Sequence, residues 1–262
     1  MTHFDDTPSP RRAFLTRVAA VGAGAAAYSL LAPHAARASG KPILELVNVP
    51  DNENFPGIPG RDKTEQVLNY ALSLETLEAD LYRQALNLAS GKPLDTPLAA
   101  DVSGYALSVP AGALSAQMAQ VGFTFLSDFA GAEAAHRDFL RSAIQARGGE
   151  PVGPNPGGYR ADFGSDLHSI LTVIRAVEEK GVRAYLGAAQ FINGFDITQT
   201  AASIYSTECR HSAALNYVLG MDPGPTRQRL DSPAVFHENG VNNFEHWQTP
   251  EQILEVAKTF YA

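Results

Sequence analysis

Two copies of one pattern of metal-binding residue types stand out in this sequence. Each copy begins with a glutamate that is followed seven residues later by a tyrosine, and it continues further along the chain with a Glu-x-x-His motif. The first copy consists of Glu75, Tyr82, Glu133 and His136, and the second consists of Glu178, Tyr185, Glu208 and His211. Because residues three, four and seven apart share one face of an α-helix, each pair projects its polar groups in one direction.

This set of side chains suits a pair of metal ions. Hard divalent and trivalent cations favour carboxylate oxygens, and imidazole suits iron, manganese and zinc. Four helices that direct Glu, Glu-x-x-His, Glu and Glu-x-x-His towards a common axis form a carboxylate-bridged two-metal site. We therefore predict that the four glutamates and two histidines bind two metal ions, and the ligands alone do not discriminate iron from manganese. The two tyrosines are placed to hydrogen-bond the carboxylates of the opposite pair.

The four helices that must position these residues follow from a 3.6-residue period of apolar positions. We predict helices from Asp62 to about Ser90, from about Ser115 to Arg147, from about Ser165 to Phe191, and from Asp196 to Gly220. Every proposed ligand lies on the apolar stripe of its helix, where an uncompensated carboxylate is unfavourable. No stretch shows convincing two-residue alternation, so the predicted fold class is all-α.

The ends of the predicted helices carry recognisable capping residues. Asp62 with Glu65, and Asp196 with Gln199, have the spacing of a capping box. Near the C-terminus, Thr249-Pro250-Glu251-Gln252 combines a cap, a first-turn proline and a capping-box partner. This predicts a short terminal helix that four apolar side chains hold against the bundle, namely Ile253, Leu254, Val256 and Phe260.

The lengths of the connections constrain the topology. The third and fourth helices are joined by only a few residues, so they should be antiparallel neighbours. The second and third helices are joined by a longer segment, which allows a crossover along the bundle. Residues 91–114 are interrupted by proline and glycine, and we interpret them as an excursion outside the bundle. We thus divide the chain into an arm at 39–61, a bundle at 62–220 with an insert at 91–114, and a tail at 221–262.

Two neighbouring glutamates compete with the proposed ligands. Glu78 lies three residues after Glu75 and shares its helix face, so the sequence leaves the choice between them open. Glu179 is rotated about 100° from the stripe that carries Glu178, which favours Glu178.

The N-terminal residues 1–38 have the composition of an export signal. Arg11-Arg12 precede Phe14 and an Ala/Gly-rich run, and Ala36-Arg37-Ala38 offers small residues for cleavage. The paired arginines resemble a twin-arginine (Tat) signal, although Pro10 directly precedes them. We predict export to the periplasm or the extracellular space, with an uncleaved anchor as the alternative.

The charge and cysteine content limit the classes of partner. Removal of residues 1–38 deletes four arginines and two aspartates, so the net charge moves from −8 to −10. An acidic chain argues against nucleic acid or an anionic membrane as a partner. The single cysteine, Cys209, cannot form an internal disulfide. We expect small molecules such as oxygen or peroxide as partners, and no membrane partner for the mature chain.

The two Glu-x-x-His motifs, in this order and with both tyrosines, resemble the ferritin-like superfamily of di-iron and di-manganese carboxylate proteins. The stretch from Leu68 to Tyr82 is similar to the opening of its exported, desiccation-related branch. The resemblance covers residues 62–220 and implies a four-helix bundle with a long crossover between helices 2 and 3, a dinuclear site, and reactions with oxygen or peroxide. The insert and the tail depart from compact cage-forming ferritins, so a homo-oligomer remains open and a cage is not expected.

Three functions are consistent with these features. The leading hypothesis is an exported oxidoreductase or peroxide-handling metalloprotein of the stress response, similar to manganese catalase or to di-iron oxidases. The alternative is a non-enzymatic structural or desiccation-protective protein in which metal, if bound, only staples the helices. Iron storage ranks last because it requires a large symmetric shell.

Overall fold

A computed structural model describes residues 54–224, 245 and 247–262 of the chain. The described part contains four long helices, α3 (Lys63–Ala89), α4 (Ala116–Ala146), α5 (Leu167–Ala188) and α6 (Phe195–Val218), and the short helix α7 (Pro250–Ala257). Single 3₁₀ turns are formed by η1 (Val102–Gly104), η2 (Ala189–Phe191) and η3 (Lys258–Phe260). Among the described residues the only β-pairing is an isolated bridge between Tyr159 and Tyr261. The prediction of an all-α fold is confirmed.

Three of the four long helices begin at a side-chain cap. The carboxylate of Asp62 accepts the N–H of Glu65 at 2.8 Å, Ser115 accepts that of Met118, and Asp166 accepts that of Ser169. Each bond satisfies one of the four backbone donors that the first turn of a helix leaves unpaired. The starts of α3 and α4 therefore lie where the sequence predicts them.

The predicted cap at Asp196 is wrong. Helix α6 begins at Phe195, its N-cap is Gly194, and Asp196 lies in the first turn. Gly194 has a φ of 108°, a conformation that an L-residue rarely adopts, so the chain reverses at this glycine and enters the helix at once. Asp196 still places a negative charge near the positive end of the helix dipole.

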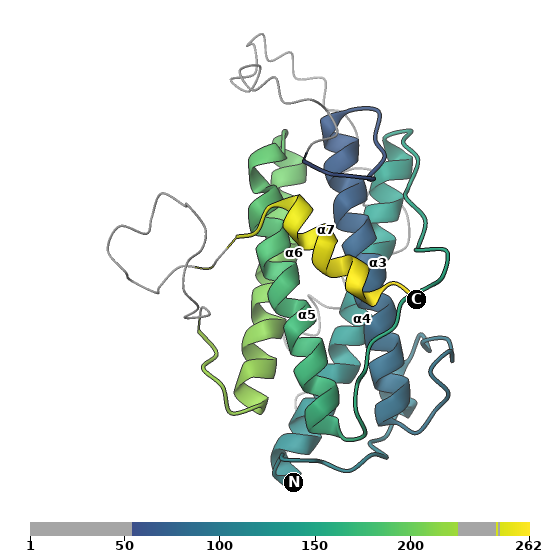
Figure 1. Ribbon diagram of the computed structural model, residues 1–262, viewed down its shortest axis with the longest axis vertical. Helices are drawn as coiled ribbons and strands as arrows, with labels where there is room; N and C mark the ends of the chain where they lie inside the picture. Colours follow the sequence, from purple (N-terminus) through teal and green to yellow (C-terminus); the bar gives the residue numbers. More distant parts are fainter. Residues whose placement is uncertain (1–53, 225–244, 246) are drawn as a thin grey trace, which may run out of the picture.

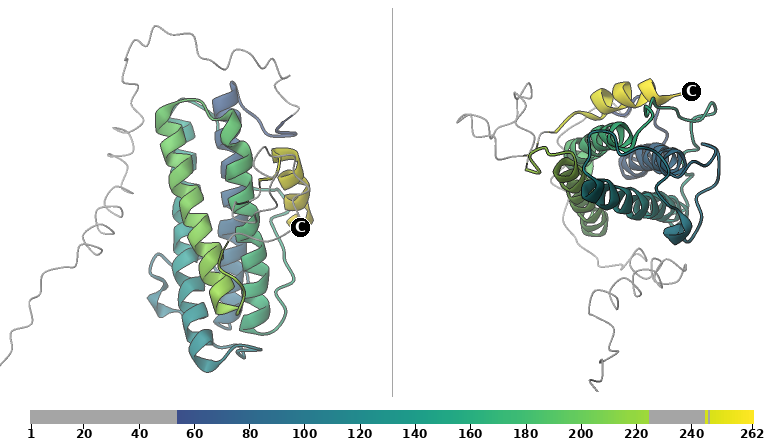
Figure 2. Two further views of the ribbon diagram at one scale, coloured as in Figure 1. Left: turned by 90° about the vertical axis from the view of Figure 1, so that its left-hand side faces the viewer. Right: turned by 90° about the horizontal axis from the view of Figure 1, so that it is seen from below.

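The long helices form a bundle of two antiparallel pairs (Figures 1 and 2). Helices α3 and α4 pack along one another, as do α5 and α6. The chain then descends from the end of α4 to the start of α5 along the length of the bundle, so α4 and α5 run in the same direction (Figure 1). The predicted antiparallel third and fourth helices and the predicted crossover are both present.

The crossover lies against α3 and is held there by buried amide side chains. Asn69, which is fully buried, donates to the carbonyl of Glu150 and accepts the N–H of Val152 at 2.8 Å. Further along α3, Gln84 donates to the carbonyl of Tyr159 at 2.9 Å. These bonds satisfy the backbone of a segment that makes no helix, as buried peptide groups require.

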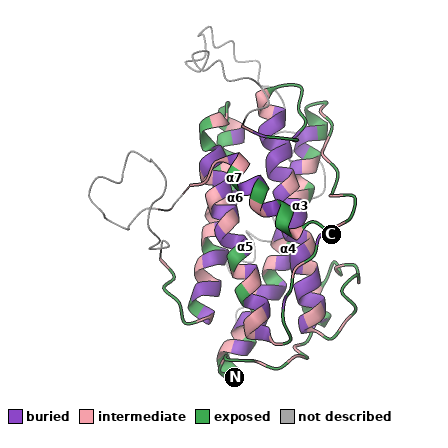
Figure 3. Cartoon of the chain, in the orientation of Figure 1, coloured by how far each residue is buried: buried purple, intermediate pink, exposed green. Residues whose placement is uncertain are grey.

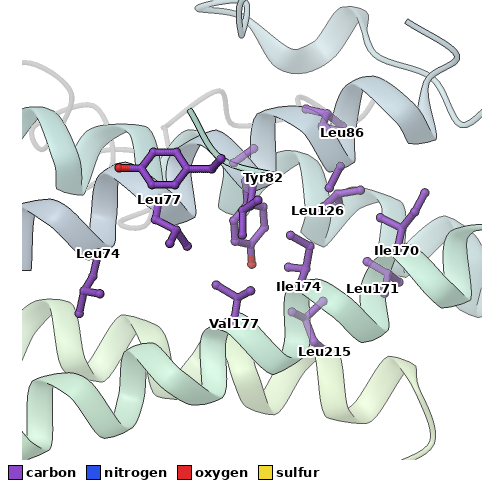
Figure 4. Close-up of a cluster of buried hydrophobic side chains, with 14 of the residues drawn as sticks. Leu74, Leu77, Tyr82, Leu86, Leu126, Ile170, Leu171, Ile174, Val177 and Leu215 are labelled. Carbon is purple, nitrogen blue, oxygen red and sulfur yellow. The ribbon is translucent and has the colours of Figure 1, made fainter. Parts of the chain in front are cut away.

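Buried residues occur on all of the long helices, along the length of the bundle (Figure 3). Figure 4 shows side chains from all four long helices meeting in the core. The fully buried members labelled there are Tyr82, Leu86, Leu126, Ile170, Leu171, Ile174 and Leu215. Burial of this apolar surface supplies the main favourable term in folding.

The terminal helix α7 packs across α5 and α3 on the outside of the bundle (Figures 1 and 2). Thr249 and Gln252 form the predicted reciprocal capping box, with Pro250 in the first turn. Of the four predicted anchors, Ile253 and Leu254 are buried, whereas Val256 and Phe260 are partly buried. The prediction of a docked terminal helix is confirmed.

The insert at residues 91–114 closes one end of the bundle. Its Tyr105 is buried, and the N–H of Ser108 donates to the carbonyl of Ala89 at the end of α3. The predicted signal, most of the arm and much of the tail lie outside the described residues. None of the helices in the described ranges is long and apolar enough to cross a membrane.

Candidate metal centre

The structure brings all six proposed ligands together midway along the bundle. Helix α3 contributes Glu75, α5 contributes Glu178, and α4 and α6 each contribute one Glu-x-x-His motif. The four glutamates are 0 to 1% exposed. Each sits on the apolar stripe of its helix, so the packing of the helices on their apolar faces also brings the carboxylates face to face.

The ligand atoms form two overlapping groups, each within 4.8 Å. The first group contains Glu75, Glu133, His136 and Glu208, and the second contains Glu133, Glu178, Glu208 and His211. Glu133 and Glu208 belong to both groups. This arrangement can hold two cations, with two shared carboxylates between them and one histidine at each.

Both histidines direct Nδ1 towards the glutamates. His136 Nδ1 lies 3.1 Å from Glu133 Oε2 and 3.3 Å from Glu75 Oε2. His211 Nδ1 lies 2.8 Å from Glu133 Oε1, and its ring stacks on Phe129 with centroids 3.8 Å apart. The three-residue spacing thus places each imidazole one helical turn after the glutamate of its own motif, so both side chains can bind the same metal ion.

The two tyrosines connect the halves of the site reciprocally. Tyr82 of α3 donates its hydroxyl to Glu178 of α5, and Tyr185 of α5 donates to Glu75 of α3 at 2.5 Å. These are the contacts that the seven-residue spacing predicts. Each bond fixes the orientation of one carboxylate and leaves its second oxygen directed elsewhere.

The site concentrates negative charge in a dry environment. Burial, together with the nearby carboxylate of Glu208, raises the pKa of Glu133 to about 7. Burial raises the pKa values of Glu178 and Glu208 well above the ordinary range, and neighbouring carboxylates add to the effect. Burial by itself would lower the pKa of His136, but its hydrogen bond to Glu133 and the neighbouring carboxylates of Glu208 and Glu75 raise it instead. Cations would relieve this repulsion directly.

The chemistry of the donor set fits a pair of metal ions. Several fully buried carboxylate oxygens accept no hydrogen bond from any residue in the described ranges: Glu75 Oε2, Glu178 Oε2, Glu208 Oε1 and Glu208 Oε2. Buried acceptors are normally paired, because an unpaired one forfeits its hydration. A divalent or trivalent cation is the partner that such an oxygen-rich, imidazole-containing set favours.

The two competing glutamates behave differently. Glu179 turns away from the site, where Ser212 donates to it at 2.7 Å and the guanidinium of Arg183 lies 3.5 Å away. Glu78, by contrast, is 4% exposed and faces the same interior as Glu75. Glu75 belongs to the first group of ligand atoms, whereas Glu78 belongs to neither group. The sequence signals both glutamates of α3, but helix periodicity could not rank them because they share a face.

Comparison with known proteins adds one finding. A family model described as a ferritin-like domain matches residues 63–221, more than half of the chain. No curated protein matches the sequence. The matched range includes all four long helices, the six proposed ligands and both tyrosines.

Proposed function

The chain belongs to the ferritin-like domain family, and from this premise we propose that its bundle holds a dinuclear iron or manganese centre that reacts with oxygen or peroxide in stress protection. The observation that supports the proposal is the set of four fully buried glutamates, several of whose oxygens have no hydrogen-bond donor among the described residues. So many unpaired carboxylates in an apolar interior are unfavourable without cations.

Each side chain would have a distinct role in such a centre. Glu133 and Glu208 would be shared between the ions, while Glu75 with His136, and Glu178 with His211, would each complete one ion's set. Two redox-active ions would supply the electron exchange that oxygen or peroxide chemistry requires.

The surrounding residues would keep water out and hold the ligands still. The stacked ring of Phe129 covers His211, and the tyrosine hydroxyls hold Glu75 and Glu178 in place. A Tyr–Glu hydrogen bond also positions a proton at a phenolic oxygen beside the site. Such fixed polar groups in a dry site act more strongly than they would in water.

Export is part of the same proposal. Residues 1–38 would form a twin-arginine signal, and the mature protein would work in the periplasm or outside the cell. The twin-arginine route suits a chain that folds around its cofactor before transport. The similarity of residues 68–82 to the desiccation-related branch supports a role in stress, with small molecules as partners and no nucleic acid.

Metal analysis of protein matured in the cell is the direct test. We expect close to two ions of iron or manganese per chain, together with peroxide disproportionation or oxygen consumption by the loaded protein. A purified, folded chain with no metal, which takes up none when iron or manganese is added, would end the proposal.

The alternative is a metal that only staples the helices, and it is favoured by one observation: every long helix contributes a ligand. A Glu133→Ala, His136→Ala double variant distinguishes the two functions. Lost turnover in a folded protein indicates an enzyme, whereas unchanged turnover with a lower unfolding temperature indicates a staple. Iron storage, the third function, would require a shell that sizing chromatography detects.

A further inference from the structure

Glu78 is a buried carboxylate that the two groups of proposed ligands do not include. It lies on α3 one turn after Glu75 and is 4% exposed. The carboxylates that interact electrostatically with Glu78 are the proposed ligands, with the strongest effect from Glu208 and the next from Glu75. Glu78 is therefore a fifth carboxylate directed at the same interior.

Helix α5 leaves room for Glu78 because a glycine stands opposite. A Cβ atom added at Gly181 would lie 2.9 Å from Glu78 Oε1 and 2.9 Å from Glu208 Oε2. The oxygens of Glu78 and Glu208 thus approach the same point from two helices. Gly181 follows Glu178 at the spacing with which Glu78 follows Glu75, so the two halves of the site differ at this position. Helix α3 has an additional carboxylate at this position, and the absence of a side chain at Gly181 of α5 leaves room for it.

One oxygen of Glu78 has no hydrogen-bond partner. Glu78 Oε2 is buried, and no donor in the described ranges contacts it. Glu78 also lines a mostly apolar cavity under α7, together with Leu77, Val177 and Ile253 among others. Lys180 lines the same cavity, but its ammonium donates to Gln248 at 2.9 Å. A cation bound beside Glu78 and Glu208 would supply the partner that Glu78 Oε2 lacks.

We propose that Glu78 is a seventh metal-binding side chain and that it biases the centre towards trivalent ions. The inference rests on the proposed function, since it requires that the six other side chains bind metal. Four carboxylates neutralise two divalent ions. A fifth adds a negative charge that divalent ions leave unbalanced, whereas ions of higher charge gain from it. Hard trivalent cations also favour additional oxygen ligands.

The test measures the affinity of the metal-free protein for two redox-inert probes under the same conditions. Mn²⁺ under nitrogen serves as the divalent probe, and Ga³⁺ delivered from its nitrilotriacetate complex serves as the trivalent one. Glu78→Gln keeps the size of the side chain and removes its charge. We expect this variant to lose affinity for Ga³⁺ by at least about tenfold more than it loses affinity for Mn²⁺.

Two further variants make the result specific. Glu179→Gln removes a buried glutamate that faces arginines instead of the site, and it should leave the ratio of the two affinities within about threefold of wild type. Glu78→Asp keeps the charge but withdraws it by one methylene, so the Ga³⁺ affinity should fall part of the way. This second variant decides the matter if circular dichroism shows that Glu78→Gln does not fold.

Equal losses for both ions in Glu78→Gln, or no loss for either, would overturn the role of Glu78 while the dinuclear centre stands. A wild-type protein that binds neither probe would overturn the centre and Glu78 together. An unchanged Ga³⁺ affinity in Glu78→Asp, with Glu78→Gln unfolded, would also count against Glu78.

Discussion

The candidate site consists of charged side chains that are rarely buried in an apolar core. Four glutamates of the site are essentially inaccessible to solvent. The seven-residue Glu-to-Tyr spacing also links the two halves of the bundle. It makes each half of the bundle donate a hydroxyl to a carboxylate of the other half. A change to one tyrosine is therefore felt at the opposite glutamate.

The first prediction tests that hydrogen bond. Tyr185→Phe removes the donor to Glu75 Oε1 while keeping the ring in place. Residues that orient metal ligands typically change metal affinity by 10–100-fold when they are lost, so we expect at least about a tenfold weaker affinity for Mn²⁺. Competition titration with a calibrated chelator measures it.

Tyr70→Phe provides the matched control. Tyr70 also lies on a bundle helix and is 1% exposed, but its hydroxyl has no hydrogen-bond partner among the described residues. Its removal should leave the Mn²⁺ affinity unchanged. Equal weakening by both variants would show that the loss comes from general packing and not from the bond to Glu75.

The second prediction concerns pH. Burial raises the pKa of Glu133 from an ordinary value of 4.5 to about 7, so the folded metal-free protein keeps a proton that the unfolded chain releases. Where the folded state binds more protons, the free energy of unfolding falls as the pH rises. Glu133 therefore lowers stability progressively between pH 4.5 and 7. The size of its shift corresponds to about 3 kcal/mol.

His136 acts in the same direction at higher pH. Its hydrogen bond to Glu133 and the neighbouring carboxylates raise its pKa above 6.5, so its stabilising contribution is complete below pH 6.5 and declines above it. Urea denaturation of the metal-free protein at pH 5, 6, 7 and 8 should show decreasing stability. Glu133→Gln should flatten the decrease between pH 5 and 7. A wild-type stability that rises over this range would contradict the assignment.

At the residue scale, periodicity predicts which glutamates and histidines gather, because ligands and core side chains share one face of each helix. What it could not predict is the role of Glu78. The inward approach of that side chain depends on Gly181, which lies about a hundred residues away on another helix. Such a long-range fit between a side chain and a missing Cβ leaves no periodic signal in the sequence.

At the scale of elements, α7 is attached to the bundle through a close backbone approach. The carbonyl of Arg183 in α5 accepts the N–H of Gln248, and a Cβ atom added at Gly187 would lie 1.8 Å from the carbonyl oxygen of Gln248. Only a glycine allows the segment before Thr249 to lie this close to the helix.

The third prediction follows from that contact. Gly187→Ala should displace the segment at Gln248 and loosen α7, since backbone atoms cannot move aside as a flexible side chain does. We expect faster amide exchange in residues 250–257 and a loss of about 1–3 kcal/mol in the free energy of unfolding. Hydrogen-exchange mass spectrometry locates the change.

Gly131→Ala is the control for helix propensity. Gly131 lies inside α4, is exposed, and would have no neighbour within 4 Å of an added Cβ atom. Alanine there should stabilise the protein by roughly 0.5–1 kcal/mol. If Gly187→Ala proves equally stabilising, with exchange in α7 unchanged, the close approach does not hold α7 in place.

The elements themselves are largely predictable from local chemistry. Caps at Asp62 and Thr249 identify helix starts because each satisfies backbone donors within its own turn. The start of α6 was misplaced because Gly194, by its positive φ, opens the helix without any side-chain bond. The path of the crossover on α3 depends on Asn69 and Gln84 reaching a segment more than seventy residues away. Local pattern carries no information on such pairings.

At the scale of the whole molecule, two elements add to the four-helix bundle. Helix α7 covers the outer side of α3 and α5, and the insert at 91–114 closes one end of the bundle. Both additions occupy faces that a bare four-helix bundle would leave open for packing between copies.

The fourth prediction is accordingly about size. Light scattering of the mature, metal-loaded protein should give a monomer or a small oligomer, and added iron should not produce a mineral-filled shell. A particle of hundreds of kilodaltons with an iron core would contradict the prediction and restore the storage function.

The last prediction unites the site with the stability of the whole bundle. An ion that binds only the folded state stabilises it by about 2.7 kcal/mol when its free concentration is a hundred times its dissociation constant. For a domain of this size, that corresponds to a rise of roughly 5–10 °C in the unfolding temperature. Because ligands come from all four long helices, the metal should delay the unfolding of the bundle as one unit. Calorimetry with and without a chelator measures the difference.

A variant without the shared carboxylates distinguishes the stabilisation that metal binding provides from the stability of the metal-free bundle. Glu133→Gln with Glu208→Gln removes two buried carboxyl groups whose ionisation is unfavourable in the apolar interior, so the metal-free variant should be at least as stable as the metal-free wild type. It should not respond to metal or to chelator. A wild type that is equally indifferent would mean that the buried glutamates are tolerated without cations, and the source of their stability would then have to lie in shared protons between the carboxyl groups.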